Sequence, residues 1–205
     1  MSTKTIGKWM VTAGLLVLGM SLPAQAQKVS KWHIDPDHSS AQFVVRHLGI
    51  SNVQGEFTKV SGEVELDEKD ITKSSVSATI DVNSIDTRNA NRDADLKTDH
   101  FFDVAKYPTM TFDSKKISQV GDGKLQVSGN LMMHGITHEA TFDVDGPTAP
   151  INDPWHHQRR GLSAIAKINR KDWGMTYGTT PMSSKGDMMI GDTITIMLDL
   201  EIVHE

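Results

Sequence analysis

The sequence K-L-Q-V-S-G-N-L-M-M-H-G-I-T-H-E-A-T-F-D-V-D-G, residues 124–146, decides the fold of this chain. Apolar and polar residues alternate over 124–133, and after Gly135 the alternation resumes and continues to Asp145. Such alternation is typical of a β-strand with one face in the core and the other in water. The stretch therefore predicts an antiparallel hairpin that turns near His134 and Gly135.

The same pattern recurs on both sides of this hairpin. We expect further strands near residues 32–34, 41–47, 55–67, 76–82, 110–112, 162–168 and 193–202. The apolar residues of the 55–67 strand change parity after Phe57, which indicates a bulge or a corner. Many short strands with no βαβ rhythm predict an all-β fold, either an antiparallel barrel or a sandwich.

Two segments interrupt the strand pattern. Residues 87–108 carry acidic side chains early and Lys97 late, which favours a short helix through the helix dipole. Residues 169–191 contain Gly and Met and show little periodicity. Loops of this length inside a compact domain are usually lids or binding loops.

Small residues at the alternating apolar positions of the strands favour the barrel over the sandwich. A barrel of about eight strands can hold one ligand if its inward side chains are small. The small residues therefore predict a cavity, whereas in a sandwich they would only allow two sheets to pack closely. These residues are Ala41, Gly62, Ala78, Gly129, Ala140, Ala164 and Ala166.

A secretory signal precedes the predicted barrel. Lys4 and Lys8 stand before an apolar run over 10–20, and Ala24-Gln25-Ala26 forms a cleavage site. Cleavage would leave residues 27–205 as one periplasmic domain with no integral membrane segment. The alternative is an uncleaved anchor, for which the apolar run is short.

Composition argues against several kinds of partner. Acidic residues outnumber Lys and Arg by 26 to 21, so the surface does not favour nucleic acid or anionic lipid. The chain has no cysteine, so its fold needs neither disulfides nor thiolate chemistry. For an exported chain this suits a bacterial periplasm better than a disulfide-stapled extracellular scaffold.

Several short motifs occur along the chain in a characteristic order. They are Asp35-Pro36-x-His38-Ser39, Arg46-His47-Leu48-Gly49, Gly55-x-Phe57, Arg92-Asp93-x-x-Leu96, Phe101-Phe102-Asp103, Tyr107-Pro108 and His134-Gly135-x-Thr137. Together, and behind a signal peptide, they resemble the YceI-like family over nearly all of the mature chain. The resemblance implies a lipocalin-like antiparallel β-barrel, exported to the periplasm, which holds a polyisoprenoid or a quinone-like lipid. It also implies a homodimer and no settled catalytic activity.

We expect the ligand, an isoprenoid or another long-chain apolar lipid, to contact the inward parity of the strands. A fatty acid or fatty amide is the alternative ligand. Phe101 and Phe102 could close one mouth of the barrel, beside the short helix. His138 also falls on the apolar parity, either as a core histidine with one hydrogen bond or as a polar contact to a ligand head group. The other predicted ligand-binding residues are Phe43, Val45, Val76, Ala78, Ile80, Phe112, Leu131, Met133, Ala140, Phe142, Ala164, Ile196 and Leu198.

Metal binding and catalysis are the competing interpretations. His134 and His138 share a spacing that a strand would place on one face, but Gly135 turns the chain between them, and His156-His157 would point opposite ways in an extended segment. We therefore predict no metal site and no cofactor. The acidic residues of 93–103 suit helix capping or solvation, and no nucleophile or phosphate-loop motif occurs. The chain is not expected to be an enzyme.

Overall fold

The computed structural model describes Met1 and residues 29–181, 186 and 188–204. Apart from Met1, the predicted signal peptide and its cleavage site lie outside the described residues. No described helix is long and apolar enough to cross a membrane.

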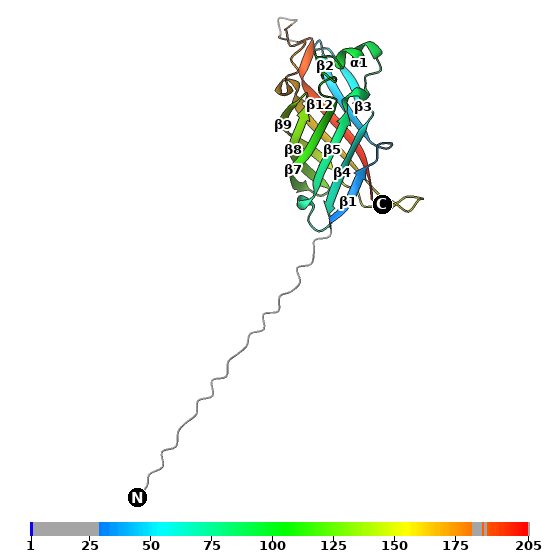
Figure 1. Cartoon of the computed structure of the whole chain (residues 1–205), viewed down its shortest axis with the longest axis vertical. Coiled ribbons are helices and arrows are strands. Elements are labelled where there is room, and N and C mark those ends of the chain that lie inside the picture. Colours follow the sequence, from blue (N-terminus) through cyan, green and yellow to red (C-terminus); the bar gives the residue numbers. More distant parts are fainter. Residues whose placement is uncertain (2–28, 182–185, 187, 205) are drawn as a thin grey trace.

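The described chain forms an antiparallel β-barrel (Figure 1). Eight strands close the ring in the order β11-β9-β8-β7-β5-β4-β1-β12, because β12 pairs with β11 as well as with β1. Strands β2, β3 and β6 continue the wall from β12, and β10 flanks β11. The strands are β1 (Val29–Ile34), β2 (Ser40–His47), β3 (Ser51–Phe57), β4 (Val60–Asp67), β5 (Ser75–Asp81), β6 (Ile85–Asp86), β7 (Thr109–Gly121), β8 (Lys124–Met133), β9 (Ile136–Asp145), β10 (Ile151–Asn152), β11 (Gln158–Asn169) and β12 (Ile190–His204).

One short α-helix, α1 (Ala90–Leu96), lies at one end of the barrel, which we call the α1 end (Figure 1). The side chain of Asn89 caps this helix by accepting a hydrogen bond from Arg92 N. The described residues also form three 3-10 turns: η1 (Ile71–Lys73), η2 (Val82–Ser84) and η3 (Arg170–Trp173). The predicted all-β barrel of about eight strands with a short helical insertion is therefore confirmed.

The central hairpin forms as predicted. Lys124 of β8 pairs with Asp145 of β9, and the register holds without a shift up to the pair of Met133 and Ile136. His134 and Gly135 both adopt positive φ angles, 52° and 72°, as tight hairpin turns require. A Cβ on Gly135 would also collide with the ring of Tyr107, so the position admits only glycine.

The single strand predicted over 55–67 is wrong. The structure has two strands there, because β3 pairs with β2 and β6, whereas β4 pairs with β1 and β5. Phe57 and Val60, on either side of the break, are both buried. The change of parity therefore marks a corner between two strands rather than a bulge within one.

At the opposite end of the barrel, which we call the Trp32 end, Trp32 packs under Arg160. Trp32 is only 1% exposed, and the guanidinium carbon of Arg160 lies 5.1 Å from the centre of its ring. Arg160 Nη2 also donates to both carboxylate oxygens of Glu68, at 2.8 and 2.9 Å. Arg160 and Glu68 therefore lie over the buried Trp32 ring at this end of the barrel.

Candidate ligand-binding cavity

The interior of the barrel encloses an elongated apolar cavity of about 250 Å³. It extends from Phe101, Phe102 and Met175 at the α1 end to Ile71 and Pro147 near the Trp32 end. All but four of its lining residues are apolar. An apolar cavity of roughly 150 Å³ already stays dry and accepts small hydrocarbons, so this larger space suits an apolar ligand.

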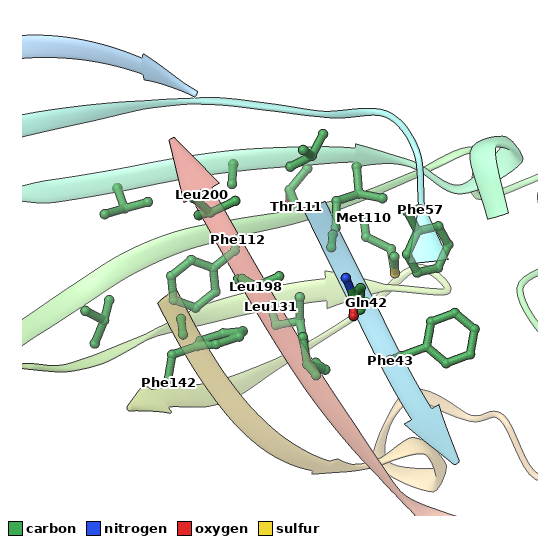
Figure 2. Close-up of a pocket in the computed structure, with 18 of the residues that line it drawn as sticks. Gln42, Phe43, Phe57, Met110, Thr111, Phe112, Leu131, Phe142, Leu198 and Leu200 are labelled. Atoms are coloured by element: carbon green, nitrogen blue, oxygen red, sulfur yellow. The ribbon is translucent and has the colours of Figure 1, made fainter. Parts of the chain in front are cut away.

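Fourteen of the sixteen predicted ligand-binding residues line this cavity. Figure 2 shows that Phe43, Phe112 and Phe142 approach the same interior space from different strands. The strand alternation therefore identifies the inner surface of the barrel correctly. The fourteen are Phe43, Val45, Val76, Ala78, Ile80, Phe101, Phe102, Phe112, Leu131, Met133, Phe142, Ala164, Ile196 and Leu198.

Ala140 is buried but does not line the cavity, contrary to the prediction. It pairs with Gly129 of β8, and a Cβ on Gly129 would lie 2.7 Å from Cζ of Phe112. The Phe112 ring therefore lies over this pair, and it packs edge-to-face on Phe142 at 5.2 Å. The small residues here make room for an aromatic ring, not for a ligand.

The same reason applies to another glycine among the strands. A Cβ on Gly55 would lie 2.5 Å from Cζ of Phe43. Our interpretation that small residues open the cavity therefore needs correction. Ala78 and Ala164 do line it, while Gly129 and Ala140 accommodate neighbouring rings.

His138 does not line the cavity either, so the structure does not place it where a ligand head group would lie. Its side chain is exposed, and its ring packs edge-on against Trp173, with ring centres 5.4 Å apart. Trp173 is 2% exposed and donates from Nε1 to the carbonyl of Leu131. The alternation along a strand shows on which side of the sheet a residue lies, but not how far along the barrel axis it lies. At the level of His138, the buried side chain of Trp173 occupies the interior.

Arg170 is a cavity-lining residue that the sequence analysis missed. It continues the inward parity of β11 one step beyond Ile168 and is only 3% exposed. Its guanidinium donates to the carbonyls of Met175, Ile190 and Gly191 at 2.6 to 3.1 Å. Burial lowers the pKa of Arg170, while the nearby Asp192 opposes this effect. Arg170 therefore holds Met175, Ile190 and Gly191 together at the α1 end of the cavity.

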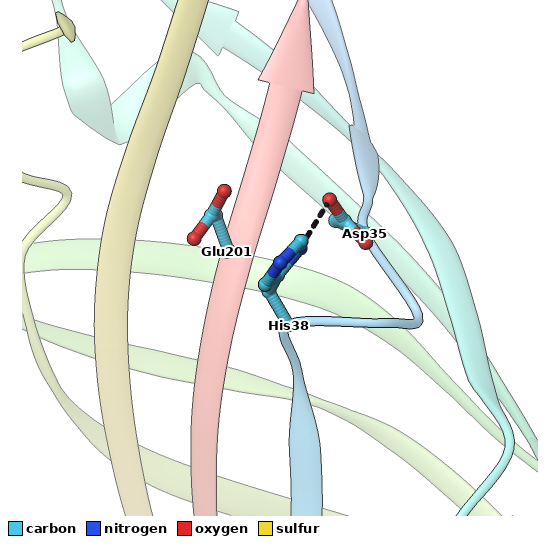
Figure 3. A group of neighbouring side chains, drawn as sticks. All are labelled: Asp35, His38 and Glu201. Atoms are coloured by element: carbon cyan, nitrogen blue, oxygen red, sulfur yellow. Dashed lines mark hydrogen bonds and ion pairs between the residues drawn. The ribbon is translucent and has the colours of Figure 1, made fainter. Parts of the chain in front are cut away.

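Outside the barrel, Asp35, His38 and Glu201 bring ligand atoms within 4.8 Å of one another (Figure 3). Nη1 of Arg159, however, lies 2.5 Å from both Asp35 Oδ2 and Glu201 Oε1, where a metal ion would have to bind. This group is therefore an ion-pair network that already contains its cation. Burial raises the pKa of Asp35, but hydrogen bonds from His38 and Arg159 outweigh it and lower the value to about 2.

The histidines considered for a metal site have other partners. His134 Nδ1 lies 3.0 Å from the carbonyl oxygen of Trp173, and the ring packs on Tyr107. His157 Nδ1 lies 3.3 Å from Asp153 Oδ2, whose other contact is Nε of Arg159. His134 and His157 therefore serve local structure.

A closed antiparallel barrel around an apolar cavity defines a class of protein, the small β-barrels whose interior can hold one ligand. Residues 32–202 match the family model described as the YceI-like domain. The chain belongs to the YceI-like family.

Relatives and solved structures agree with this assignment. A UPF0312 protein of Vibrio parahaemolyticus is 37% identical over 160 residues, which cover 77% of this chain and 84% of the relative. BcnA of Burkholderia cenocepacia has the same fold, with a TM-score of 0.68 at 23% identity, over 82% of this chain and 98% of BcnA. A polyisoprenoid binding domain from Saccharophagus degradans superposes with a TM-score of 0.61 at 17% identity, over 85% of this chain and 98% of that domain.

Proposed function

We propose that this protein is a periplasmic carrier that holds a long-chain isoprenoid or quinone-like lipid inside its barrel. The observation that carries the proposal is the elongated cavity, whose lining is apolar except at four residues. The polyisoprenoid binding domain with the same fold supports this class of ligand.

The energetics of burial agree with such a ligand. Each buried CH₂ contributes about 0.8 kcal/mol, so one isoprene unit contributes roughly 3 kcal/mol before ordering costs. A few units suffice for tight binding. Methionines at the wall, such as Met110, Met133 and Met175, adapt their shape to a methyl-branched chain.

Native mass spectrometry of protein purified from its own periplasm tests the proposal. We expect a bound mass that organic solvent extracts and that fragments as an isoprenoid chain. A fatty acid or fatty amide in its place would support the alternative ligand. Protein that carries no extractable lipid, and that takes up none when incubated with isoprenoids, would refute the carrier function.

A further inference from the structure

Exposed apolar side chains surround the α1 end of the barrel. Leu48 and Ile50 lie in the turn between β2 and β3, Ile136 begins β9, and Tyr177 follows η3. Ile136 belongs to the same end, because its Cδ1 would lie 3.3 Å from a Cβ on Gly174. We call Leu48, Ile50, Ile136 and Tyr177 the apolar rim. Apolar groups exposed together in this way are typical of a surface that meets another molecule or a membrane.

Hydrogen bonds of the main chain hold two parts of the apolar rim together. Leu48 N donates to the carbonyl of Met189 at 3.0 Å. The next residue, Ile190, donates from its N–H to the carbonyl of Gly178 at 3.2 Å, and Gly178 is the neighbour of Tyr177. The β2–β3 turn and Tyr177 are therefore fixed beside each other.

The apolar rim is continuous with the lining of the cavity. The ring of Tyr177 stacks on His100, with ring centres 4.8 Å apart, and packs edge-on against Phe101 at 5.3 Å. Phe101 lines the cavity, and so does Ile190. The rim therefore adjoins the apolar wall that the proposed ligand would contact.

The β2–β3 turn carries a residue that does not suit its backbone. Leu48 and Gly49 adopt φ angles of 51° and 70°, and Ile50 N donates to the carbonyl of His47 at 3.1 Å. Turns with two positive φ angles favour Asn-Gly or Asp-Gly, because a bulky apolar side chain is disfavoured there. Leu48 is also exposed, so its side chain does not stabilise the free protein by burial. Contact with an apolar phase would offset this cost.

We propose that the apolar rim docks the α1 end of the barrel on the surface of a lipid bilayer. Leu48 and Ile50 insert at the boundary of head groups and acyl chains, and Tyr177 lies at the level of the head groups. Tyrosine is enriched at that level because its ring is apolar and its hydroxyl polar. The proposal rests on the proposed carrier function, since a long-chain isoprenoid is stored in a bilayer and not in water.

The charges beside the apolar rim favour no particular lipid charge. Lys171 Nζ pairs with Asp192 Oδ2 at 2.6 Å, and His100 Nδ1 lies 3.8 Å from Asp95 Oδ1. Basic and acidic groups thus accompany each other, and the chain as a whole has an excess of acidic residues. We therefore expect insertion of apolar groups, and not attraction to anionic lipid, to hold the protein on the bilayer.

The Trp32 end also has exposed apolar residues, chiefly Ile151 and Trp155. Their loop is anchored through Asp153, whose Oδ2 accepts from Nε of Arg159 at 2.7 Å. None of these four residues lines the cavity, whereas the apolar rim contacts residues that do. The α1 end is therefore the end that we expect to face the bilayer.

Sedimentation with phosphatidylcholine vesicles provides the first test. Ile50→Asp should weaken binding by about tenfold or more, whereas Ile151→Asp should stay within about twofold of the wild type. The control is matched, because Ile50 is 76% exposed and Ile151 is 65% exposed. A wild-type protein that does not sediment, or two variants that lose binding equally, would overturn the proposal. So would binding that requires phosphatidylglycerol, or an apolar rim that is covered by a second copy of the protein in solution.

Uptake of geranylgeraniol separates this proposal from the carrier function. From loaded phosphatidylcholine vesicles, Ile50→Asp should take up the alcohol about tenfold more slowly than the wild type, because it docks more weakly. From dilute ethanol, both proteins should reach the same occupancy. Equal rates from vesicles would overturn docking and leave the carrier function intact. Uptake from neither source would refute the carrier function, and vesicle sedimentation would still decide docking.

Tryptophan fluorescence shows which end of the barrel meets the bilayer. Of the three tryptophans that the structure describes, Trp32 and Trp173 are buried and Trp155 is exposed at the Trp32 end. Vesicles of brominated phosphatidylcholine should leave Trp155 of the bound wild-type protein unquenched, and they should quench the new side chain of Ile50→Trp. Quenching of Trp155 would place the Trp32 end on the bilayer and overturn the proposal.

Discussion

Single small residues on the inner face of this barrel differ in what they make room for, and two alanines allow a direct comparison. Ala164 lines the cavity beside Leu198, whereas Ala140 lies opposite Gly129 and the Phe112 ring. Ala164→Phe should fill the cavity, keep the free energy of unfolding nearly unchanged and abolish lipid binding. Ala140→Phe should overpack the core and lower the free energy of unfolding by roughly 1–3 kcal/mol. Denaturant titration and mass spectrometry of extracted lipid measure both effects.

Full lipid occupancy in a stably folded Ala164→Phe protein would show that the lipid binds elsewhere. The difference between the two alanines could not be predicted from the sequence, because both fall on the inward parity. Alternation gives the face of a strand on which a residue lies. Which inward residues are covered by a neighbouring ring depends on side-chain packing across several strands.

The ion pairs around Arg159 connect three elements of the wall. Arg159 of β11 pairs with Asp35, in the turn after β1, and with Glu201 of β12. Because the pKa of Asp35 falls from 3.8 to about 2 on folding, its contribution to stability is complete above pH 3.8. That contribution is lost as the pH falls through about 2. We expect the melting temperature to fall over this interval, and Asp35→Asn to flatten the fall, as measured by circular dichroism.

Asp37→Asn is the matched control, since Asp37 is an exposed carboxylate in the same turn and makes no ion pair with Arg159. It should leave the acid transition unchanged. An Asp35→Asn protein with the wild-type profile would mean that the network does not couple to folding. Asp153, another partner of Arg159, also has a lowered pKa. Part of the acid transition should therefore remain in the Asp35→Asn protein.

Elements whose pattern is strictly alternating, such as β8, β9 and β12, could be predicted with their inward faces. The break between β3 and β4 could not be predicted. Its two residues are Thr58 and Lys59, and neither is a glycine or a proline that would mark the end of a strand. Arg170 was missed for a related reason: a charged residue at the end of a strand is usually exposed. Its burial depends on three carbonyls, those of Met175, Ile190 and Gly191, which the fold brings to it.

Export of the entire protein is the remaining prediction. If Lys4, Lys8 and Ala24-Gln25-Ala26 act as a signal, the mature chain begins at Gln27 and appears in an osmotic-shock fraction. Intact-mass measurement identifies the first residue. Protein that retains the apolar run and stays with the membrane fraction would contradict cleavage. Sedimentation of the same sample tests the predicted homodimer.

The pairing of β12 sets the time at which this barrel can form. Near the carboxyl end of the chain, β12 bonds to β1 and β2 from the beginning of the domain, as in the contact between Asp35 N and Glu201 O. The ring therefore cannot close before β12 has been synthesised. Contacts so distant in sequence also slow folding. A chain that still lacks β12 has an open sheet, and an unclosed chain is the state in which a polypeptide can be threaded across a membrane.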